Sequence, residues 1–421
     1  MNKSKAYRAL DVNKVNWERV LTGRENQDGH LGFDMGKRQI LCVLRWGGAD
    51  FERPWRVQNP SEVRLLAERV AYLSEGRRLV VAMEPTGTYG DALRQALAEV
   101  GVVTHRVSPK MASDFAEVFD GVPSQHDGKD AAVVAELAAQ GRCWPWPWCA
   151  ANEADQEMEY WVDWLEMQRR QMVMWLGQLE AQVSRHWPEA TRIVQLRSGT
   201  LLAVLEYYGG PQALAADSEG LGRVRAWGRH YLGAEKAEAL VASARNTAGV
   251  RQGHWDQERL QSCAREVLAC RKKMRQATRR LQALAQGNRI IEKQAEIVGA
   301  ATACVLWVHV GDPSGYHCGA AYRKAMGLNL AERSSGQYQG QLKISKRGSA
   351  SVRRWLYLAA LRQVRQEPAR SWYERQKEAR RGQGKPALVG IMRKLCLALY
   401  QVGGRGKKFA REQLFDAQAE K

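Results

Sequence analysis

The sequence predicts an α/β domain followed by helical domains, which is an α/β plus all-α organisation. Between residues 30 and 148, short apolar runs alternate with amphipathic segments, which is the pattern of strands and helices in one domain. Residues 151–190 and 256–285 instead repeat apolar positions at steps of three and four, as long paired helices do. A chain of 421 residues is also too long for a single core, so we expect two or three domains.

The charge of the chain indicates a polyanionic partner. The formal net charge is +19, with 64 Lys and Arg against 45 Asp and Glu. Residues 320–421 alone contain 23 Lys and Arg against 7 Asp and Glu, so an excess of 16 positive charges lies in the last quarter of the chain. Aromatic and aliphatic residues interleave these charges, as in a folded phosphate-binding domain. The alternative is a solvated basic tail.

The composition gives no sign of a membrane or of an oxidising compartment. The chain has no run of eighteen or more apolar residues, and its amino terminus is polar, so we expect a cytoplasmic protein without a membrane partner. The eight cysteines are scattered without a CxxC motif. This spacing predicts free thiols rather than a zinc site or a disulfide framework.

Residues 1–29 are predicted to be an N-terminal extension outside the first domain. The run Ala9-Leu10-Asp11 is similar to a strand that ends in an aspartate, but Asn13 and Lys14 follow almost at once and no second strand is evident. We therefore expect Asp11 to take no part in a site.

The first domain should begin with an antiparallel meander. Residues 31–37 and 39–45 are two extended segments joined tightly, and a third lies around residues 55–57. Asp34 alternates with apolar neighbours, so its side chain should lie on the face opposite to theirs. The first hairpin therefore exposes one carboxylate.

Helices and strands then alternate. The segments that follow are a helix at 61–74 with Ser61 as its cap, a strand at 79–83, a helix at 89–100, a strand at 102–107 and a helix from Pro109. Three strands followed by helix, strand, helix, strand and helix is the succession of an RNase H-like domain. In that fold, acidic residues from the first strand, the fourth strand and a late helix meet. We place this domain at residues 30–148.

The fourth strand ends in a candidate metal ligand. Its five apolar residues, 79–83, are typical of a strand buried on both faces, and the Pro-Thr-Gly that follows Glu84 is a turn signature. Ligands collect at the carboxyl ends of strands in open α/β sheets. Glu84 is therefore better explained as a metal ligand than as a solvated charge.

A late helix supplies two more acids. Residues 121–126 are loop-like, and the helix that follows carries Asp127 and Asp130 in its first turn, where their spacing places both on one face. Alone, they would be explained by the helix dipole. Together with Asp34 and Glu84 they form four carboxylates that repel one another unless divalent cations neutralise them. Two cations on such a cluster would serve phosphodiester chemistry.

A Trp-Pro repeat at residues 144–148 is predicted to end the domain as a stiff extended linker, with its tryptophans packed against the sheet rather than stacked on bases.

In the middle of the chain, residues 149–290, apolar residues form two coiled-coil seams, the first interrupted by Arg169. The seams could satisfy each other in an intramolecular hairpin or form a dimer, and the sequence favours neither. Residues 191–255 between them are interpreted as an inserted helical subdomain.

The carboxy-terminal region, residues 291–421, contains a candidate nucleophile among basic residues. A turn within residues 297–311 could touch phosphate through backbone amides. Ser334 and Ser335 follow Arg333 in a loop, where a serine is usually only a turn residue. In this basic setting, however, a hydroxyl could attack a bound phosphate. The predicted nucleic-acid-binding residues are Arg333, Lys343, Lys346, Arg347, Arg353 and Arg354.

Together, these motifs resemble those of the DEDD transposases of bacterial insertion sequences, which are bridge-RNA-guided recombinases related to the Piv pilin-gene invertases. The motifs are Gly32-Phe33-Asp34-Met35-Gly36-Lys37, Met83-Glu84-Pro85-Thr86-Gly87-Thr88-Tyr89, Asp127 with Asp130-Ala131, and Ser334-Ser335-Gly336 with Ile344-Ser345-Lys346-Arg347-Gly348. The resemblance covers roughly residues 30–400, and the Glu84 motif is its most specific part.

The resemblance implies a RuvC-like domain at 30–148, a coiled-coil middle and a transposase domain at 291–421. It implies that the four carboxylates hold Mg²⁺, for which Mn²⁺ can substitute, and that Ser335 forms the covalent link to DNA. The implied partners are donor and target double-stranded DNA and a structured bridge RNA from the ends of the element. The protein would form dimers that pair into tetramers, with the serine of one protomer facing the acids of another, in the nucleoid of the bacterial cytoplasm.

Three other functions stay open. A Piv-like DNA invertase would share these motifs. A Holliday-junction resolvase would hydrolyse DNA with water and two metal ions, without a covalent step, so Ser335 separates it from a transposase. A non-catalytic nucleic-acid-binding dimer would use the basic face and the coiled coil, but it would gain nothing from four aligned acids.

Overall fold

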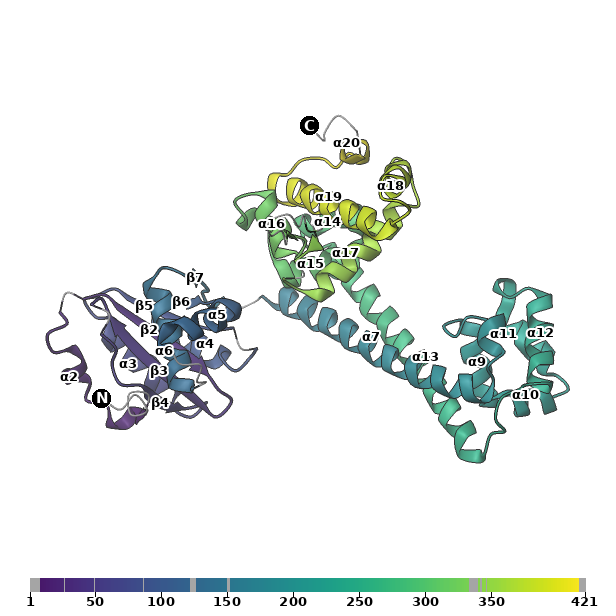
Figure 1. Cartoon of the computed structure of the whole chain (residues 1–421), viewed down its shortest axis with the longest axis horizontal. Helices are drawn as coiled ribbons and strands as arrows, with labels where there is room; N and C mark the ends of the chain where they lie inside the picture. The colour runs from purple at the N-terminus through teal and green to yellow at the C-terminus, as the bar shows by residue number, and fades with distance from the viewer. Residues whose placement is uncertain are drawn as a thin grey trace. The chain divides into compact units, whose positions relative to one another are not determined.

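The computed structural model describes residues 8–25, 27–48, 50–85, 87–121, 126–149, 152–332, 340, 343–345 and 347–415. The chain divides into two compact units, residues 1–150 and 151–421. The first unit contains a seven-stranded sheet, and helices make up most of the second (Figure 1). The predicted mixed α/β class is confirmed.

The sheet of the first unit has the strand order β1-β4-β3-β2-β5-β6-β7. Its strands are β1 (Leu10–Asp11), β2 (Gly29–Met35), β3 (Gln39–Trp46), β4 (Trp55–Gln58), β5 (Leu79–Met83), β6 (Thr104–Arg106) and β7 (Trp144–Pro145). Strands β2, β3 and β4 form the predicted antiparallel meander, and β5 and β6 add parallel strands beyond β2. Strand β5 is apolar along its whole length and β3 along most of it, because helices cover both faces of the sheet.

Four main helices cover the sheet of the first unit: α3 (Val63–Ser74), α4 (Asp91–Glu99), α5 (Pro109–Phe119) and α6 (Asp127–Ala139). The largest core cluster of this unit joins the apolar residues of α3 and α4 to β2, β3 and β4. Separate clusters join α6 to the sheet and to α5. Helix α6 is apolar nearly all round and buried along most of its length, so its position on the sheet is tightly defined.

The start of the chain belongs to this unit, and the prediction of an extension outside the domain is wrong for the described residues. Leu10 of β1 pairs in parallel with Trp55 of β4. Val12, Val15 and Val20 enter the main core. The short helix α2 (Trp17–Leu21) places the Trp17 ring 4.8 Å from that of Trp55.

Two further local predictions differ from the structure. Helix α3 begins at Val63 after Glu62, without a side-chain cap, so Ser61 is not the cap. The carboxylate of Glu62 instead accepts a hydrogen bond from the backbone N–H of Gln58 at 2.7 Å. The tryptophan repeat is also more than a linker, because β7 pairs with β6 and the Arg94 guanidinium lies 3.5 Å from the centre of the Trp146 ring.

In the second unit, the long helices α7 (Glu153–His186) and α13 (His254–Ala285) pack against each other within one chain. Most residues of the two predicted seams, such as Met158, Val162 and Leu281, are buried, which is the intramolecular alternative. Gln168 rather than Arg169 occupies the middle of the seam, since Gln168 is buried and Arg169 pairs with Glu166 at 3.1 Å. The Arg280 guanidinium also binds Glu157 across the pair, at 2.5 and 2.8 Å.

The segment between these helices is helical, as predicted. It contains α8 (Ala190–Ile193), α9 (Gly199–Tyr208), α10 (Pro211–Ala216), α11 (Gly220–Gly228) and α12 (Ala234–Arg245). These helices share an apolar core with the neighbouring ends of α7 and α13. The segment therefore has its own hydrophobic centre.

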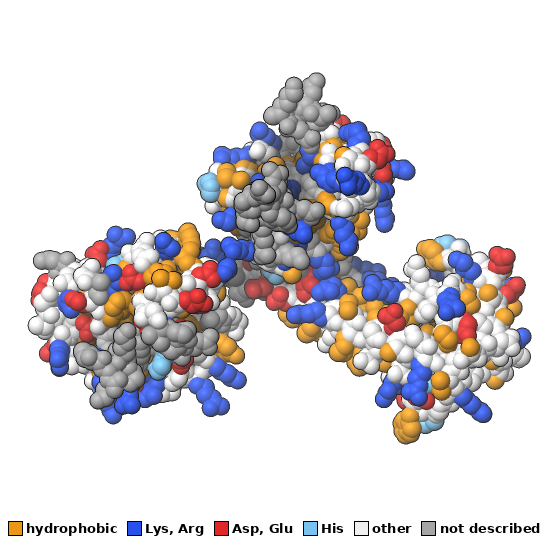
Figure 2. All heavy atoms as spheres, viewed as in Figure 1, with side chains coloured by type: hydrophobic (Ala, Val, Ile, Leu, Met, Phe, Trp, Pro, Cys, Tyr) orange, Lys and Arg blue, Asp and Glu red, His pale blue; other side chains and the backbone are white. Residues whose placement is uncertain are grey.

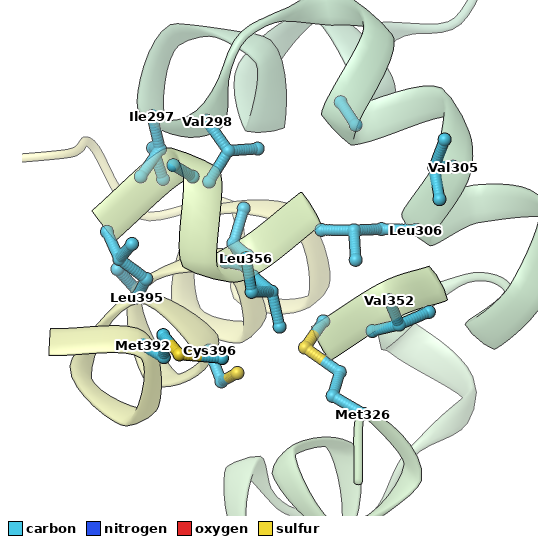
Figure 3. Close-up of a cluster of buried hydrophobic side chains, with 14 of the residues drawn as sticks. Ile297, Val298, Val305, Leu306, Met326, Val352, Leu356, Met392, Leu395 and Cys396 are labelled. Atoms are coloured by element: carbon cyan, nitrogen blue, oxygen red, sulfur yellow. The ribbon is translucent and has the colours of Figure 1, made fainter. Parts of the chain in front are cut away.

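The remaining helices of the second unit surround α19 (Gly384–Arg405) (Figure 1). They are α14 (Arg289–Val298), α15 (Ala300–Val310), α16 (Gly319–Ala325), α17 (Ala350–Gln363), α18 (Ala369–Glu378) and α20 (Arg411–Phe415). Figure 3 shows how Ile297, Leu356 and Leu395 point toward one another in their shared core. The short strands β8 (Leu330–Ala331) and β9 (Lys343–Ile344) pair as an antiparallel hairpin.

Helix α19 is strongly apolar for its length. Among the described residues it alone is long and apolar enough to cross a membrane, with a mean hydropathy of 1.2 over an 18-residue window. More than half of that window, 56%, is buried inside the unit. Its apolar residues, such as Ile391 and Leu395, form the core of the helical region, which is how a core helix behaves.

All eight cysteines are free, as predicted.

Candidate functional site

The sheet places two predicted acids next to each other. Strands β2 and β5 are parallel neighbours, with Phe33 opposite Met83. Asp34 directly follows Phe33 in the sequence, and Glu84 directly follows Met83. Asp34 is half-buried between Phe33 and Met35, which are both buried. The two carboxylates therefore lie at the same edge of the sheet, where the carboxyl ends of parallel strands collect ligands.

Helix α6 brings the other two acids to this edge, and Gly32 makes its approach possible. A Cβ built at Gly32 would lie 2.2 Å from the Ala131 carbonyl oxygen and 2.4 Å from the Ala135 nitrogen. Any side chain at position 32 would therefore push α6 away from β2. The first turn of α6 carries Asp127 and Asp130, so this close contact brings both toward Asp34.

Two ion pairs hold α6 in place. The Arg45 guanidinium of β3 donates to Glu136 at 2.5 Å, and both side chains are largely buried. The Lys129 ammonium is almost completely buried and lies 2.7 Å from the Asp120 carboxylate just after α5. Because an unpaired buried charge is costly, each pair restricts where α6 can sit. Lys129 was not among the residues predicted for the site. Its position in a largely apolar helix could have indicated that it is buried and paired.

Burial and neighbouring carboxylates raise the pKa values of Asp34, Glu84 and Asp130. Burial, and then the charges of Asp127 and Asp130, raises the pKa of Asp34 to about 6. Burial, and then Asp34 and Asp130, raises the pKa of Glu84 to about 7. The pKa of Asp130 is also raised, by burial and then by Asp127. Strongly raised carboxyl pKa values at one edge are typical of functional sites.

The acids border two hollows of the surface. One, of about 450 Å³, is lined by Glu84, Asp127 and Asp130 together with His126. The other, of about 480 Å³, is lined by Asp34 and Asp127 together with Lys37 and Arg38. Asp127 lies between the two hollows. The site therefore offers carboxylate oxygens on one side and basic side chains beside them.

The residue types fit a divalent cation. Carboxylate oxygens are the ligands that Mg²⁺ and Mn²⁺ prefer. A bound cation would relieve the repulsion that, together with burial, raises the pKa values of these carboxyls. Within the described part of the chain, no three Asp, Glu, His or Cys side chains are close enough together to hold an ion as they stand. The acids share one edge of the sheet without forming a closed cage.

We expect the metal-free protein to lose stability as the pH rises from about 4 to about 7. In this range Asp34 and Glu84 keep their protons in the folded state but lose them in the unfolded state, where the pKa values are 3.8 and 4.5. The free energy of unfolding therefore falls as the pH rises through the folded pKa values. Thermal melts with a chelator measure this slope, and Glu84→Gln should reduce it. An identical slope in the variant would contradict the assignment to this carboxylate.

The predicted residues of the second unit divide into two groups. Arg333, Ser334, Ser335 and Lys346 lie outside the described residues. Lys343 of β9 and Arg347 are exposed. Arg353 is bound to its own turn, because its guanidinium donates to the Gly348 carbonyl at 2.8 Å.

Arg354, another predicted nucleic-acid-binding residue, is paired within the protein. Its guanidinium pairs with Glu166 of α7 and lies 4.9 Å from the centre of the Trp355 ring. Glu166 also accepts from the Ser351 hydroxyl at 2.9 Å and the Trp355 indole at 2.8 Å. Burial opposes the charge on Glu166, but these hydrogen bonds and Arg169 hold its pKa below the ordinary value. Arg354 therefore helps to fix α17 on α7.

Comparison with known proteins bears on the second unit. Residues 294–374 match the family model described as the transposase IS116/IS110/IS902 family. The matched segment runs from within α14 into α18 and includes the β8–β9 hairpin. No curated protein matches the chain. The family match supports an insertion-sequence transposase, and therefore a DNA-processing enzyme with a transposase or recombinase function.

Proposed function

We propose that the protein is an RNA-guided transposase that cuts and rejoins DNA through a serine and a Mg²⁺-binding acidic cluster. The match at residues 294–374 supports the transposase class. One observation supports the finer proposal: acids from β2, from the end of β5 and from the first turn of α6 meet at one sheet edge. This is the arrangement expected of a RuvC-like domain.

In this proposal Asp34, Glu84, Asp127 and Asp130 hold the cation. A bound Mg²⁺ would offset the charge of the scissile phosphate and favour a deprotonated nucleophile. The chain supplies rigidity, because the carboxylates stand on a central sheet and on a helix held by buried ion pairs. Lys37 and Arg38, which line the hollow beside Asp34, would contact the DNA backbone.

Ser335 is the proposed nucleophile. Its Oγ forms a bond to the phosphorus while the bond from phosphorus to one sugar oxygen of the strand breaks. The hydroxyl proton passes to a general base, and the released sugar oxygen takes up a proton. Attack by the sugar oxygen of another strand reverses these changes and rejoins the DNA. The exposed Lys343 and Arg347 would offset the charge of the phosphate.

The proposed partners follow from charge and from the resemblance. They are donor and target double-stranded DNA, a structured bridge RNA and other copies of the chain, which form dimers and then tetramers. The excess of 16 positive charges in residues 320–421 supports polyanionic partners. The proposed location is the bacterial cytoplasm, at the nucleoid.

Removal of RNA tests the guided reaction. RNA is expected to copurify with the protein, and digestion of that RNA should stop recombination between a donor and a target plasmid. Adding back a transcript of the DNA that flanks the gene should restore it. A heat-treated nuclease serves as the control. Recombination that continues unchanged after digestion would contradict RNA guidance and favour a Piv-like invertase.

A further inference from the structure

Helix α13 carries an arginine-rich segment upstream of the region that matches the transposase model. From residue 267 to residue 291 the chain has seven Lys and Arg and no Asp or Glu. Figure 2 shows Lys and Arg side chains along the pair of helices α7 and α13. Arg271, Arg275 and Arg279 recur every fourth residue and therefore lie on one face of the helix. We call these three residues the arginine ridge.

In the described part of the chain, none of the three ridge arginines forms an ion pair with a carboxylate. The neighbouring Arg280, in contrast, pairs with Glu157. Arg275 and Arg279 are exposed. The Arg271 guanidinium donates to the Arg197 carbonyl at 2.5 Å. Burial, and then the charges of Arg275 and Arg197, lowers the pKa of Arg271. Positive charges so close together favour an anionic ligand.

The ridge also borders a hollow. A depression of about 480 Å³ is lined by the three arginines together with Met172 of α7 and Met274 and Thr278 of α13. Its lining thus combines methionine side chains with guanidinium groups. Inorganic phosphate would use only the charges. A nucleic-acid strand would use both, because its phosphates alternate with sugars and bases that have apolar faces.

We propose that the arginine ridge binds the sugar-phosphate backbone of a nucleic-acid strand. Its three residues span about 12 Å of helix, and a strand of duplex DNA presents one phosphate in about every 3.4 Å along its axis. The ridge can therefore face three or four successive phosphates. This inference rests on the proposed function for the class of partner, and it adds a binding surface outside residues 294–374.

The test compares two double variants of the full-length protein. Arg275→Gln with Arg279→Gln removes two exposed charges from the ridge. Arg259→Gln with Arg265→Gln removes two exposed charges from the same helix outside it. Binding is measured across a salt series with a labelled RNA hairpin, a single-stranded DNA and a duplex DNA of equal length. Thermal melts check that both variants stay folded.

The affinity of the ridge variant for at least one probe should fall about tenfold or more. The affinities of the control variant should stay close to those of the unmodified protein. Each lost phosphate contact should reduce the salt slope by about 0.9 on duplex DNA and about 0.7 on a single strand. Loss confined to the RNA hairpin would identify the strand as RNA, and loss on duplex DNA would identify it as DNA. Equal binding by the two variants would overturn the inference. If Arg347→Gln weakened binding in that case, the proposed function would still stand.

Discussion

Replacing Asp34 or Glu84 with alanine is expected to abolish DNA strand cleavage, with a rate loss of about a thousandfold or more. Each carboxylate contributes to a cluster whose charges need a cation, and removal of one ligand weakens the site for that cation. The loss should appear with Mg²⁺ and with Mn²⁺. Cleavage of labelled DNA in the presence of each metal measures it.

The same substitutions should leave the fold intact. Burial and neighbouring acids raise the pKa of both residues, so their charges oppose folding above neutral pH. Alanine at either position removes that repulsion. Thermal melts without metal should therefore show variants at least as stable as the unmodified protein, which separates loss of chemistry from loss of structure.

Asp11→Ala provides the matched control for these variants. Asp11 also ends a strand of the same sheet, but it is only partly buried and its carboxylate accepts from the Asn13 backbone N–H at 3.0 Å. Its loss should remove only this local cap and should leave cleavage unchanged. Loss of cleavage in Asp11→Ala together with activity in Asp34→Ala would contradict the assignment of the site.

The parts of the fold that the sequence predicts are those with local signals. The run of apolar residues before Glu84 identifies a buried strand, and the three-four spacing of Met158, Val162 and Leu165 identifies a paired helix. For strand β1 the sequence shows a strand-like run, Ala9-Leu10-Asp11, but no signal for its partner strand. Its two residues are held only by a parallel partner, with Leu10 opposite Trp55, and no periodicity within the segment could indicate that pairing.

The acidic site was partly predictable for the same reason. The sequence places Asp34, Glu84, Asp127 and Asp130 at the ends of elements, and fold topology then places those ends together. The close contact between Gly32 and α6 was not predictable, because a glycine in a strand does not say which backbone approaches it. Arg354 shows a second limit. Its partner Glu166 lies 188 residues away, and a count of charges cannot tell a paired arginine from a free one.

Replacing Ser335 with alanine is expected to abolish the covalent protein–DNA adduct. A serine hydroxyl attacks phosphate only when its proton is removed and the charge of the phosphate is offset. The basic residues around position 335 and the proposed cation would supply these conditions. Ser334→Ala is the neighbouring control and should keep the adduct, because the resembling motif places the nucleophile directly before Gly336.

Cleavage of DNA through a serine assisted by the acidic cluster is tested most directly by trapping the protein–DNA adduct and mapping it by mass spectrometry. The reaction is stopped with denaturant in the presence of Mg²⁺, and the attached nucleotide is located on the digested protein. We expect a nucleotide on Ser335 that is absent from Ser335→Ala and from Asp34→Ala. DNA attached to Ser334 would correct the residue. Efficient cleavage by a protein with both serines replaced, without any adduct, would contradict the serine mechanism and favour a resolvase that uses metal ions and water.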